Sequence, residues 1–371
     1  MPEQAYGKGA DMYRSFQVRN FRCFDHLEMT DLTRVNLVAG RNGVGKTALL
    51  EALFLHAGAY NPKLTLNIHG FRGYDAVKFE LGRWAETPWG ALFPEFDPSQ
   101  AIEFSSQDDV GVRRASRLRL LRDSDDLARA AVVVQPYVEA VRESPVSYET
   151  SAVLELEYEE AQSSHKYFMI VEPEGSRIRP LPPAPPFPAF FMAARTRVPR
   201  SEDVERFSKL KLEGHEGVLL GILKVIEPRL KHLEVLAPGG VSMIHGDVGL
   251  RRMLPLFDLG EGVVRLTSLV VSMARAKGGV VLVDEIENGL HHSVLSKVWQ
   301  AVGQAAREFG VQLFCTTHSW EAIVAAHEAF SSREPYELGL FRLDRVRDAV
   351  RAISYDQSAL GAAIESGLEV R

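Results

Sequence analysis

An eight-residue stretch rich in glycine has the spacing of a loop that binds nucleotide phosphates. Its residues are Gly40, Arg41, Asn42, Gly43, Val44, Gly45, Lys46 and Thr47. Glycines let the backbone curl until successive amides point at phosphate oxygens, and the dipole of a following helix adds to the attraction. Lys46 would reach the β- and γ-phosphates, and the Thr47 hydroxyl would bind Mg²⁺. The alternative is a chance glycine-rich turn, which the flanking strand and helix patterns disfavour.

Two acidic residues end an apolar run and form a second candidate site. Residues 280–283 are uninterruptedly apolar, and Asp284 and Glu285 follow them. A carboxylate at the tip of a buried strand is costly unless a cation compensates it. A Mg²⁺ ion beside Thr47 would do so, with Asp284 orienting the metal or its water. Glu285 is then the candidate general base for an attacking water. An ordinary solvated strand end is the alternative.

A histidine follows the next predicted strand. Residues 311–315 are mostly apolar, and Thr316, Thr317, His318 and Ser319 come directly after them. His318 could donate a hydrogen bond to a γ-phosphate, with Thr316 or Thr317 nearby as sensors. A single histidine is more often structural than functional. Its place on the strand after the acidic one favours the functional interpretation.

The apolar pattern predicts which elements position these motifs. Residues 35–39 predict a short buried strand that stops at Gly40, and residues 48–54 predict a helix. The run 280–283 is typical of a strand covered on both faces. Helical spacing follows over 295–305, and another strand begins at Val311. This alternation predicts a largely parallel sheet flanked by helices and built from both ends of the chain.

The middle of the chain has a different hydrophobicity pattern. Leu118 and Leu120 alternate with Arg117 and Arg119, which is typical of antiparallel strands with one solvent-exposed face. Six prolines between residues 180 and 188 indicate a stiff connector. We therefore divide the chain into residues 1–60, an inserted lobe over 61–199 that is mainly antiparallel β, and residues 200–371.

Taken together, these motifs resemble the ABC-type P-loop ATPases of the SMC, RecF and OLD group. The resemblance rests on residues 16–24, 40–47, 284–292 and 316–319, which occur in the order of that group. It implies an α/β ATPase head that hydrolyses ATP with Mg²⁺, with Asp284, Glu285 and His318 at the hydrolytic site. In that group ATP is sandwiched between two heads. The resemblance therefore also implies a homodimer that forms through ATP, each P-loop facing a signature motif of the partner.

The best match to the signature motif is Leu259-Gly260-Glu261-Gly262, at the start of a predicted helix. Glycines at a helix N-terminus offer amides to a γ-phosphate arriving from the other subunit. The sequence departs from the group at Gly260, where a serine is usual, and no glutamine loop can be assigned. A plain loop-to-helix turn remains open for these glycines.

Two further motifs have a functional and a plain interpretation. Arg22 sits where related heads carry a residue close to the nucleotide, but it could equally be a solvated surface arginine. The tandem His291-His292 suggests a metal, yet no nearby cysteine or spaced acid completes a site. The resemblance instead places the two histidines near the dimer interface.

Composition limits the partners. The formal net charge is −6, which argues against a uniformly basic nucleic-acid-binding surface. No apolar run approaches the length of a membrane span, and the two cysteines are expected to be reduced in a cytoplasmic protein. The densest basic cluster comprises Arg113, Arg114, Arg117, Arg119 and Arg122. It could follow a phosphate backbone, or it could be a wet strand face balanced by Asp123, Asp125 and Asp126.

Two functions of different class follow. In the first, ATP binding gates a DNA-associated process or a nuclease effector supplied in trans, in DNA maintenance or anti-phage defence. The effector would be a separate chain because nothing after His318 matches the TOPRIM nuclease that OLD relatives carry. In the second, the chain is an ATP-dependent scaffold whose inserted lobe binds protein and never contacts nucleic acid.

Overall fold

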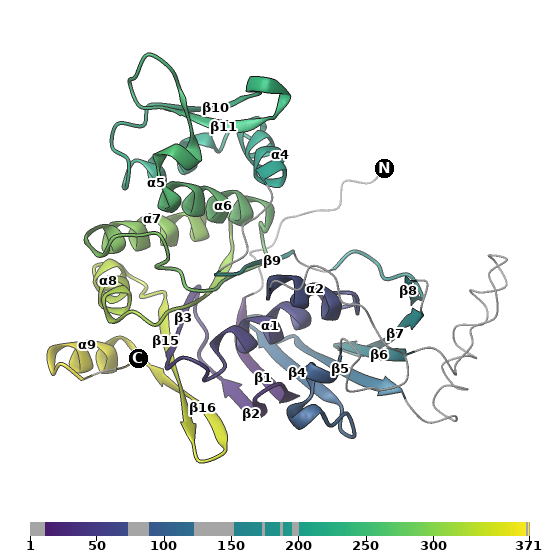
Figure 1. Cartoon of the computed structure of the whole chain (residues 1–371). Helices are drawn as coiled ribbons and strands as arrows, with labels where there is room; N and C mark the ends of the chain where they lie inside the picture. Colours follow the sequence, from purple (N-terminus) through teal and green to yellow (C-terminus); the bar gives the residue numbers. More distant parts are fainter. Residues whose placement is uncertain are drawn as a thin grey trace.

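A computed structural model describes residues 12–72, 89–121, 152–172, 175–185, 188–194, 200–368 and 370. It contains a six-stranded mixed sheet, a seven-stranded antiparallel sheet and a small three-stranded sheet (Figure 1). Helices lie between the two large sheets and on the outer face of the mixed one. The predicted α/β class is confirmed.

The mixed sheet carries the predicted motifs. Its strand order is β16 (Ala349–Tyr355), β15 (Leu338–Val346), β3 (Val35–Gly40), β14 (Gln312–Thr316), β13 (Val280–Val283) and β9 (Ala189–Met192). All pairs are parallel except β15 with β16. Every residue of β3, β13 and β14 is buried, as continuous apolar runs predict for strands covered on both faces. The carboxyl ends of these three strands therefore meet at one edge of the sheet.

The antiparallel sheet crosses the boundary expected at residue 60. Its order is β2 (Phe24–Met29), β1 (Tyr13–Phe21), β4 (Ile102–Asp108), β5 (Arg113–Leu121), β6 (Ala152–Glu160), β7 (Ser163–Glu172) and β8 (Gly175–Arg179). The predicted antiparallel strands of the middle stretch thus extend a sheet that β1 and β2 begin, because β4 pairs along β1. The division of the chain into three domains stays a prediction.

Helix α1 (Lys46–Ala57) lies between the two large sheets. All of its residues except Thr47 are buried, and its apolar side chains share one core cluster with β1, β4 and β5 on one side and with Val38, Leu282 and Phe314 on the other. A helix that is apolar all round is expected where it is covered on every side. This burial fixes the start of α1 relative to the strand ends of the mixed sheet.

The other face of the mixed sheet is covered by α6 (Glu261–Arg275), α7 (Leu295–Glu308) and α8 (Trp320–Ser331), which share a second core cluster with it. Beyond α6 lie α4 (Arg200–Leu212), α5 (Glu216–Leu223) and the three-stranded sheet of β10 (His232–Leu236), β11 (Met243–Asp247) and β12 (Leu254–Pro255). Two shorter helices are α2 (Leu64–Phe71) and α9 (Gln357–Glu365). Short 3₁₀ turns occur at Gly90–Leu92, Pro94–Phe96, Pro238–Gly240, Leu256–Leu259 and His292–Val294. Among the described residues, no helix is both long and apolar enough to cross a membrane.

Candidate functional site

The glycine-rich loop joins the end of β3 to the start of α1, as predicted. Three of its glycines have positive φ: 143° at Gly40, 77° at Gly43 and 116° at Gly45. A Cβ at Gly40 would lie 2.7 Å from the carbonyl oxygen of Leu343, and one at Gly45 would lie 2.6 Å from the Sγ of Cys23. Sterics therefore exclude other residues at Gly40 and Gly45. The loop has the tight curl that a phosphate cradle needs.

Lys46 is folded over this loop. Its Nζ donates to the carbonyl oxygens of Gly40 at 2.6 Å and Arg41 at 3.2 Å. Burial lowers the pKa of Lys46, while the negative charge of Asp284 and Glu285 opposes that effect. An ammonium group in such a position gains from an anionic partner. The side chain is thus placed for a phosphate above the loop.

Asp284 brings the loop and the acidic strand together. Its Oδ2 accepts a hydrogen bond from the Thr47 hydroxyl at 3.0 Å. Its Oδ1 accepts one from the Thr316 hydroxyl at 2.6 Å. The three side chains come from α1, the end of β13 and the end of β14. The result is a compact group of carboxylate and hydroxyl oxygens, which is the ligand type that Mg²⁺ prefers.

Glu285 has an unusual backbone conformation. Its φ is 52°, in the left-handed region that non-glycine residues seldom adopt. Its amide donates to Thr316 Oγ1 at 2.8 Å, and its Oε2 accepts a hydrogen bond from Asn288 Nδ2 at 2.8 Å. Outliers of this kind gather at functional sites because the surroundings must hold them. The Glu285 carboxylate also interacts electrostatically with Lys46, which places it at the same edge of the sheet as the P-loop.

His318 lies beside two glutamates. Its Nδ1 is 3.7 Å from Glu285 Oε1 and 3.3 Å from Glu287 Oε1. The His318 amide also donates to Glu287 Oε1 at 3.0 Å. The structure therefore brings His318 to the acidic strand end, as predicted. It adds Glu287 as the residue that holds the histidine, a role that the sequence did not indicate.

The signature-like segment lies against the loop that follows the acidic strand. Gly260 has a φ of 115° and caps α6. A Cβ at Gly262 would lie 2.6 Å from the carbonyl oxygen of Gly289, and Glu261 is also close to Gly289. Packing within one chain therefore accounts for a glycine at position 262. A contact of Gly260, Glu261 and Gly262 with a partner's nucleotide stays a prediction.

Arg22 is not a solvated surface arginine. Its side chain is only 11% exposed, and its Nε lies 2.7 Å from Oε2 of the fully buried Glu51 on α1. Glu51 also binds Arg72, whose Nε lies 2.7 Å from Oε1. Burial lowers the pKa of Arg22, and Glu51 opposes that effect. The ion pair holds the Arg22 side chain against α1. The Sγ of the next residue, Cys23, contacts the loop near Val44. A nucleotide contact stays a prediction.

The rings of the two adjacent histidines contact each other at a tilt of 38°. The ring centroids of His291 and His292 are 4.1 Å apart, and His291 Nδ1 is 2.9 Å from Ser293 Oγ. Across the part of the chain that the structure describes, there is no group of three or more His, Cys, Asp or Glu side chains that could hold a metal ion.

The predicted basic cluster has acidic partners. Arg117 Nη2 is 2.6 Å from Glu103 Oε1, and Arg119 is 3.6 Å from Glu155. Arg114 points to the other side of the sheet. It is buried and binds Asp108 and Glu160, each at 2.6 Å. Arg122, Asp123, Asp125 and Asp126 lie outside the described residues.

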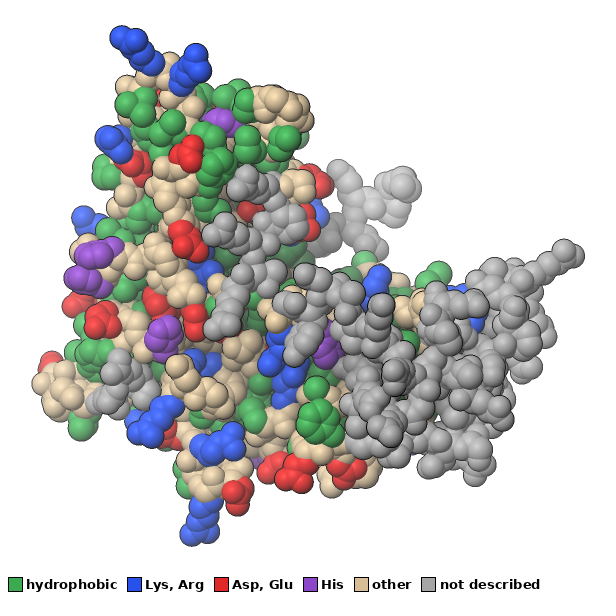
Figure 2. All heavy atoms as spheres, in the orientation of Figure 1, with side chains coloured by type: hydrophobic (Ala, Val, Ile, Leu, Met, Phe, Trp, Pro, Cys, Tyr) green, Lys and Arg blue, Asp and Glu red, His purple; other side chains and the backbone are tan. Residues whose placement is uncertain are grey.

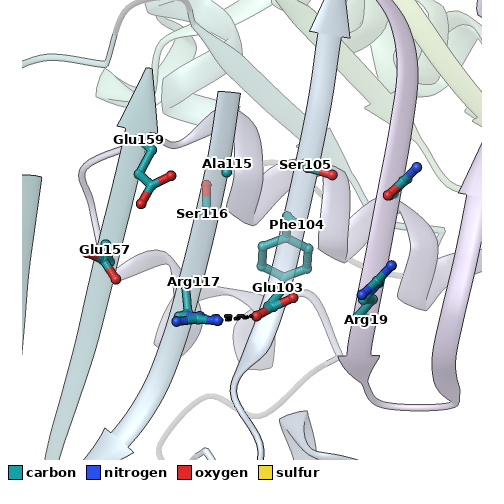
Figure 3. Close-up of a pocket in the computed structure, with 10 residues that line it drawn as sticks. Arg19, Glu103, Phe104, Ser105, Ala115, Ser116, Arg117, Glu157 and Glu159 are labelled. Carbon is teal, nitrogen blue, oxygen red and sulfur yellow. Dashed lines mark hydrogen bonds and ion pairs between the residues drawn. The ribbon is translucent and has the colours of Figure 1, made fainter. Parts of the chain in front are cut away.

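The outer face of the antiparallel sheet thus carries both charge signs in alternation. Arg19, Glu103, Arg117, Glu157 and Lys166 stand opposite one another on β1, β4, β5, β6 and β7. The first four of these residues border a polar hollow of about 290 Å³ whose lining also includes Ser105 and Ala115 (Figure 3). On the side of the molecule drawn in Figure 2, acidic and basic side chains are likewise interspersed. The hollow lies on the face away from α1 and is separate from the P-loop.

Comparisons with known proteins agree with this geometry. A family model for an AAA domain, whose description also names the AbiEii toxin of a type IV toxin–antitoxin system, matches residues 60–325. A second AAA-domain model matches residues 15–65. A curated relative named ATP/GTP phosphatase, from Helicobacter pylori, is 21% identical over an alignment of 343 residues, and the match covers 84% of this chain and 86% of the relative.

Solved structures of SMC heads are also similar. One is an SMC head bound to the C-winged helix domain of ScpA, with a TM-score of 0.48, 12% identity, and coverage of 95% of this chain and 99% of that chain. Another is the SMC head domain from Thermotoga maritima, with a TM-score of 0.42, 12% identity, and coverage of 93% and 99%. The AAA-domain model that covers 60–325 spans more than half of the sequence. The chain belongs to this AAA-domain family and is a P-loop ATP hydrolase.

Proposed function

We propose that this chain hydrolyses ATP with Mg²⁺ at the P-loop, and that two copies close on ATP to control an effector. The observation that carries the proposal is the hydrogen bond of the Thr47 hydroxyl to Asp284 Oδ2, at 3.0 Å. It joins the loop that would hold phosphates to the strand end that would hold a metal. A hydroxyl and a carboxylate side by side suit a hard cation such as Mg²⁺.

Each residue of the site has one task in this proposal. Lys46 and the loop amides bind the β- and γ-phosphates, and Thr47 and Asp284 hold Mg²⁺. The metal would neutralise charge on the β- and γ-phosphates. Glu285 orients the attacking water and accepts its proton. His318 donates a hydrogen bond to the γ-phosphate from the ring nitrogen that does not face the two glutamates.

Dimerisation through ATP is the second part of the proposal. Gly260 and Gly262 of one copy would offer the amides at the start of α6 to the nucleotide of the other. Support comes from the exposed position of Glu261 at that helix start and from its packing against the loop that follows the acidic strand. The relative named ATP/GTP phosphatase makes GTP the nucleotide to compare with ATP.

Two processes are candidates for what the ATPase controls. We favour a DNA-associated process or a nuclease effector in trans, in DNA maintenance or anti-phage defence. The alternative is a protein-binding scaffold without nucleic-acid contact. The Arg117–Glu103 pair at 2.6 Å favours that alternative for the outer sheet face, because a neutralised arginine contributes little to phosphate binding.

The proposed ATPase is tested with Lys46→Met and a matched exposed control, Lys297→Met. Lys46→Met should weaken binding of a fluorescent ATP analogue at least about tenfold, since a charge-assisted hydrogen bond is worth about 1.5–3 kcal/mol. The control should bind as the wild type does. Equal affinity in all three proteins would contradict the site.

Titration of duplex DNA in the presence of MgATP, at several salt concentrations, tests whether the chain binds nucleic acid. Binding that falls with salt, and that weakens in a variant with Arg117→Glu and Arg119→Glu, supports a nucleic-acid contact at this face. Salt-dependent binding that survives these substitutions would move the contact to another surface. Absence of binding at low salt would leave the protein-binding scaffold as the function.

A further inference from the structure

A half-buried arginine on α6 connects the signature-like segment to the acidic strand end. Arg265 lies four residues after Glu261, the first residue of α6. Its Nη2 donates to the main-chain carbonyl oxygens of both Asp284 and Glu285, to the latter at 2.8 Å. One side chain therefore holds the two consecutive peptide groups that carry the proposed metal ligand and the proposed base.

The backbone conformation explains why two consecutive carbonyls can reach one donor. In an extended strand, successive carbonyl groups point to opposite sides. At Glu285 the φ of 52° turns the chain out of the strand conformation. The two carbonyls then converge on the guanidinium, whose planar fork donates to neighbouring acceptors. The Arg265 hydrogen bonds thus stabilise the left-handed turn that directs Glu285.

A second contact joins the same two elements. Gly262 packs so closely on the Gly289 carbonyl that no side chain would fit between them. The first turns of α6 therefore contact the segment after β13 at two places, through Arg265 at Asp284 and Glu285 and through Gly262 at Gly289. A shift of α6 would move residues 284–289 with it, because packed elements transmit displacement.

Electrostatics favour a charged Arg265 in this position. Burial lowers the pKa of Arg265, and Asp284, Glu287 and Glu285 oppose that effect. Its two hydrogen-bonded carbonyls are part-buried at the end of β13. Replacing Arg265 by an apolar side chain would leave those carbonyls without this donor and would remove the constraint on the turn.

We propose that Arg265 is a positioning residue that holds Glu285 in its hydrolytic orientation and couples it to the start of α6. This inference rests on the proposed function, in which Gly260 and Gly262 bind the nucleotide of the partner copy. Docking of that nucleotide would then set the base of the chain that receives it. Hydrolysis at each site would depend on closure of the dimer as well as on ATP binding.

The test compares Arg265→Met, Arg265→Lys and a control, Arg275→Met, at the exposed end of the same helix. Affinity for a fluorescent ATP analogue, turnover, melting temperature and ATP-dependent dimerisation by sedimentation are measured for each. For Arg265→Met we expect ATP affinity within about twofold of wild type and turnover at least about tenfold lower, because small displacements of a catalytic group have large rate effects. Arg265→Lys keeps a cationic donor and should recover part of the rate. Arg275→Met should match the wild type.

Protein concentration provides the readout for coupling. Wild-type turnover per chain should rise as ATP-bound dimers form, and Arg265→Met should dimerise without that rise. Full turnover in Arg265→Met would overturn the inference, as would parallel loss of ATP affinity and turnover. If Arg265→Met does not fold, Arg265→Lys decides the question. Turnover below wild type with unchanged ATP affinity supports the positioning role, whereas parallel loss of ATP affinity and turnover overturns it.

Failure of the dimer itself would look different. A wild-type chain that hydrolyses ATP but stays monomeric would contradict the proposed dimer and the coupling. The positioning role would still be decided in that monomer, by whether Arg265→Met lowers turnover without lowering ATP affinity.

Discussion

Thr47 and Asp284 lie 237 positions apart in the sequence, yet the Thr47 hydroxyl is 3.0 Å from Asp284 Oδ2. The contact forms because β3 and β13 flank β14 in one parallel sheet, so that their carboxyl ends meet. Residues separated by most of the chain thereby form the oxygen cluster in which the proposal places Mg²⁺.

Substitution of Thr47 tests that cluster. Thr47→Val keeps the shape of the side chain but removes the hydroxyl, so ATP hydrolysis at fixed Mg²⁺ should fall by tenfold or more, about the effect of losing one hydrogen bond to a charged group. Thr47→Ser restores the hydroxyl and should restore the rate. The measurement is turnover against Mg²⁺ concentration, with Thr33→Val as a control outside the site. Equal Mg²⁺ dependence in Thr47→Val and wild type would contradict the assignment.

Glu287 and His318 should act as one unit. Glu287 Oε1 lies 3.3 Å from His318 Nδ1, so a change in either side chain disturbs the same contact, whereas the main-chain hydrogen bond of the His318 amide to Glu287 Oε1 does not depend on the imidazole. We expect Glu287→Gln, His318→Ala and the double variant to have similar turnover, because effects of contacting residues are not additive. ATP affinity should change little in Glu287→Gln. Fully additive losses in turnover would show that the two residues act independently.

His56 predicts a pH dependence of stability. It is buried on α1 between Ser106 and Ser116, and burial, with a smaller effect of Arg114, lowers its pKa to about 3. In the unfolded chain His56 has a pKa of about 6.5. Between pH 3 and 6.5 it therefore binds a proton in the unfolded chain but not in the folded chain. The contribution of His56 to the free energy of unfolding is therefore constant above about pH 6.5. As the pH falls from there toward 3, the free energy of unfolding decreases by about 1.4 kcal/mol per pH unit.

Denaturant unfolding at pH 7.5, 6 and 5 measures that slope. His56→Gln should unfold more easily than wild type at pH 7.5, and the difference should shrink as the pH falls. The exposed His292→Gln serves as the control and should follow the wild type at every pH. A constant difference between His56→Gln and wild type across this range would contradict the prediction.

The motifs that lie close together in sequence were predicted well. The P-loop of 40–47 and the acidic strand end at 284–285 depend on local turns and apolar runs, and both lie where the pattern indicates. The antiparallel pairing of β4 with β1 was not predicted, because its register depends on partners about 90 positions apart, such as Phe16 and Ser106. Local periodicity contains no information about such pairing.

Side-chain partners were less predictable than the elements. Nothing in the sequence separates Arg265, which binds two main-chain carbonyls, from the exposed Arg275 on the same helix. Likewise, Arg22 has the sequence surroundings of a surface residue but pairs with the buried Glu51. These contacts depend on the packing of elements that are distant in sequence, which a single sequence does not specify.

The most direct test of the central claim is hydrolysis and association in Glu285→Gln with MgATP, with Glu328→Gln on α8 as the control. Loss of the proposed general base should lower turnover by about 10²–10⁴-fold. ATP affinity should remain near that of the wild type, and sedimentation should show an ATP-bound dimer that persists. Glu328→Gln should hydrolyse ATP at the wild-type rate. Wild-type turnover in Glu285→Gln would contradict both the base assignment and the mechanism built on it.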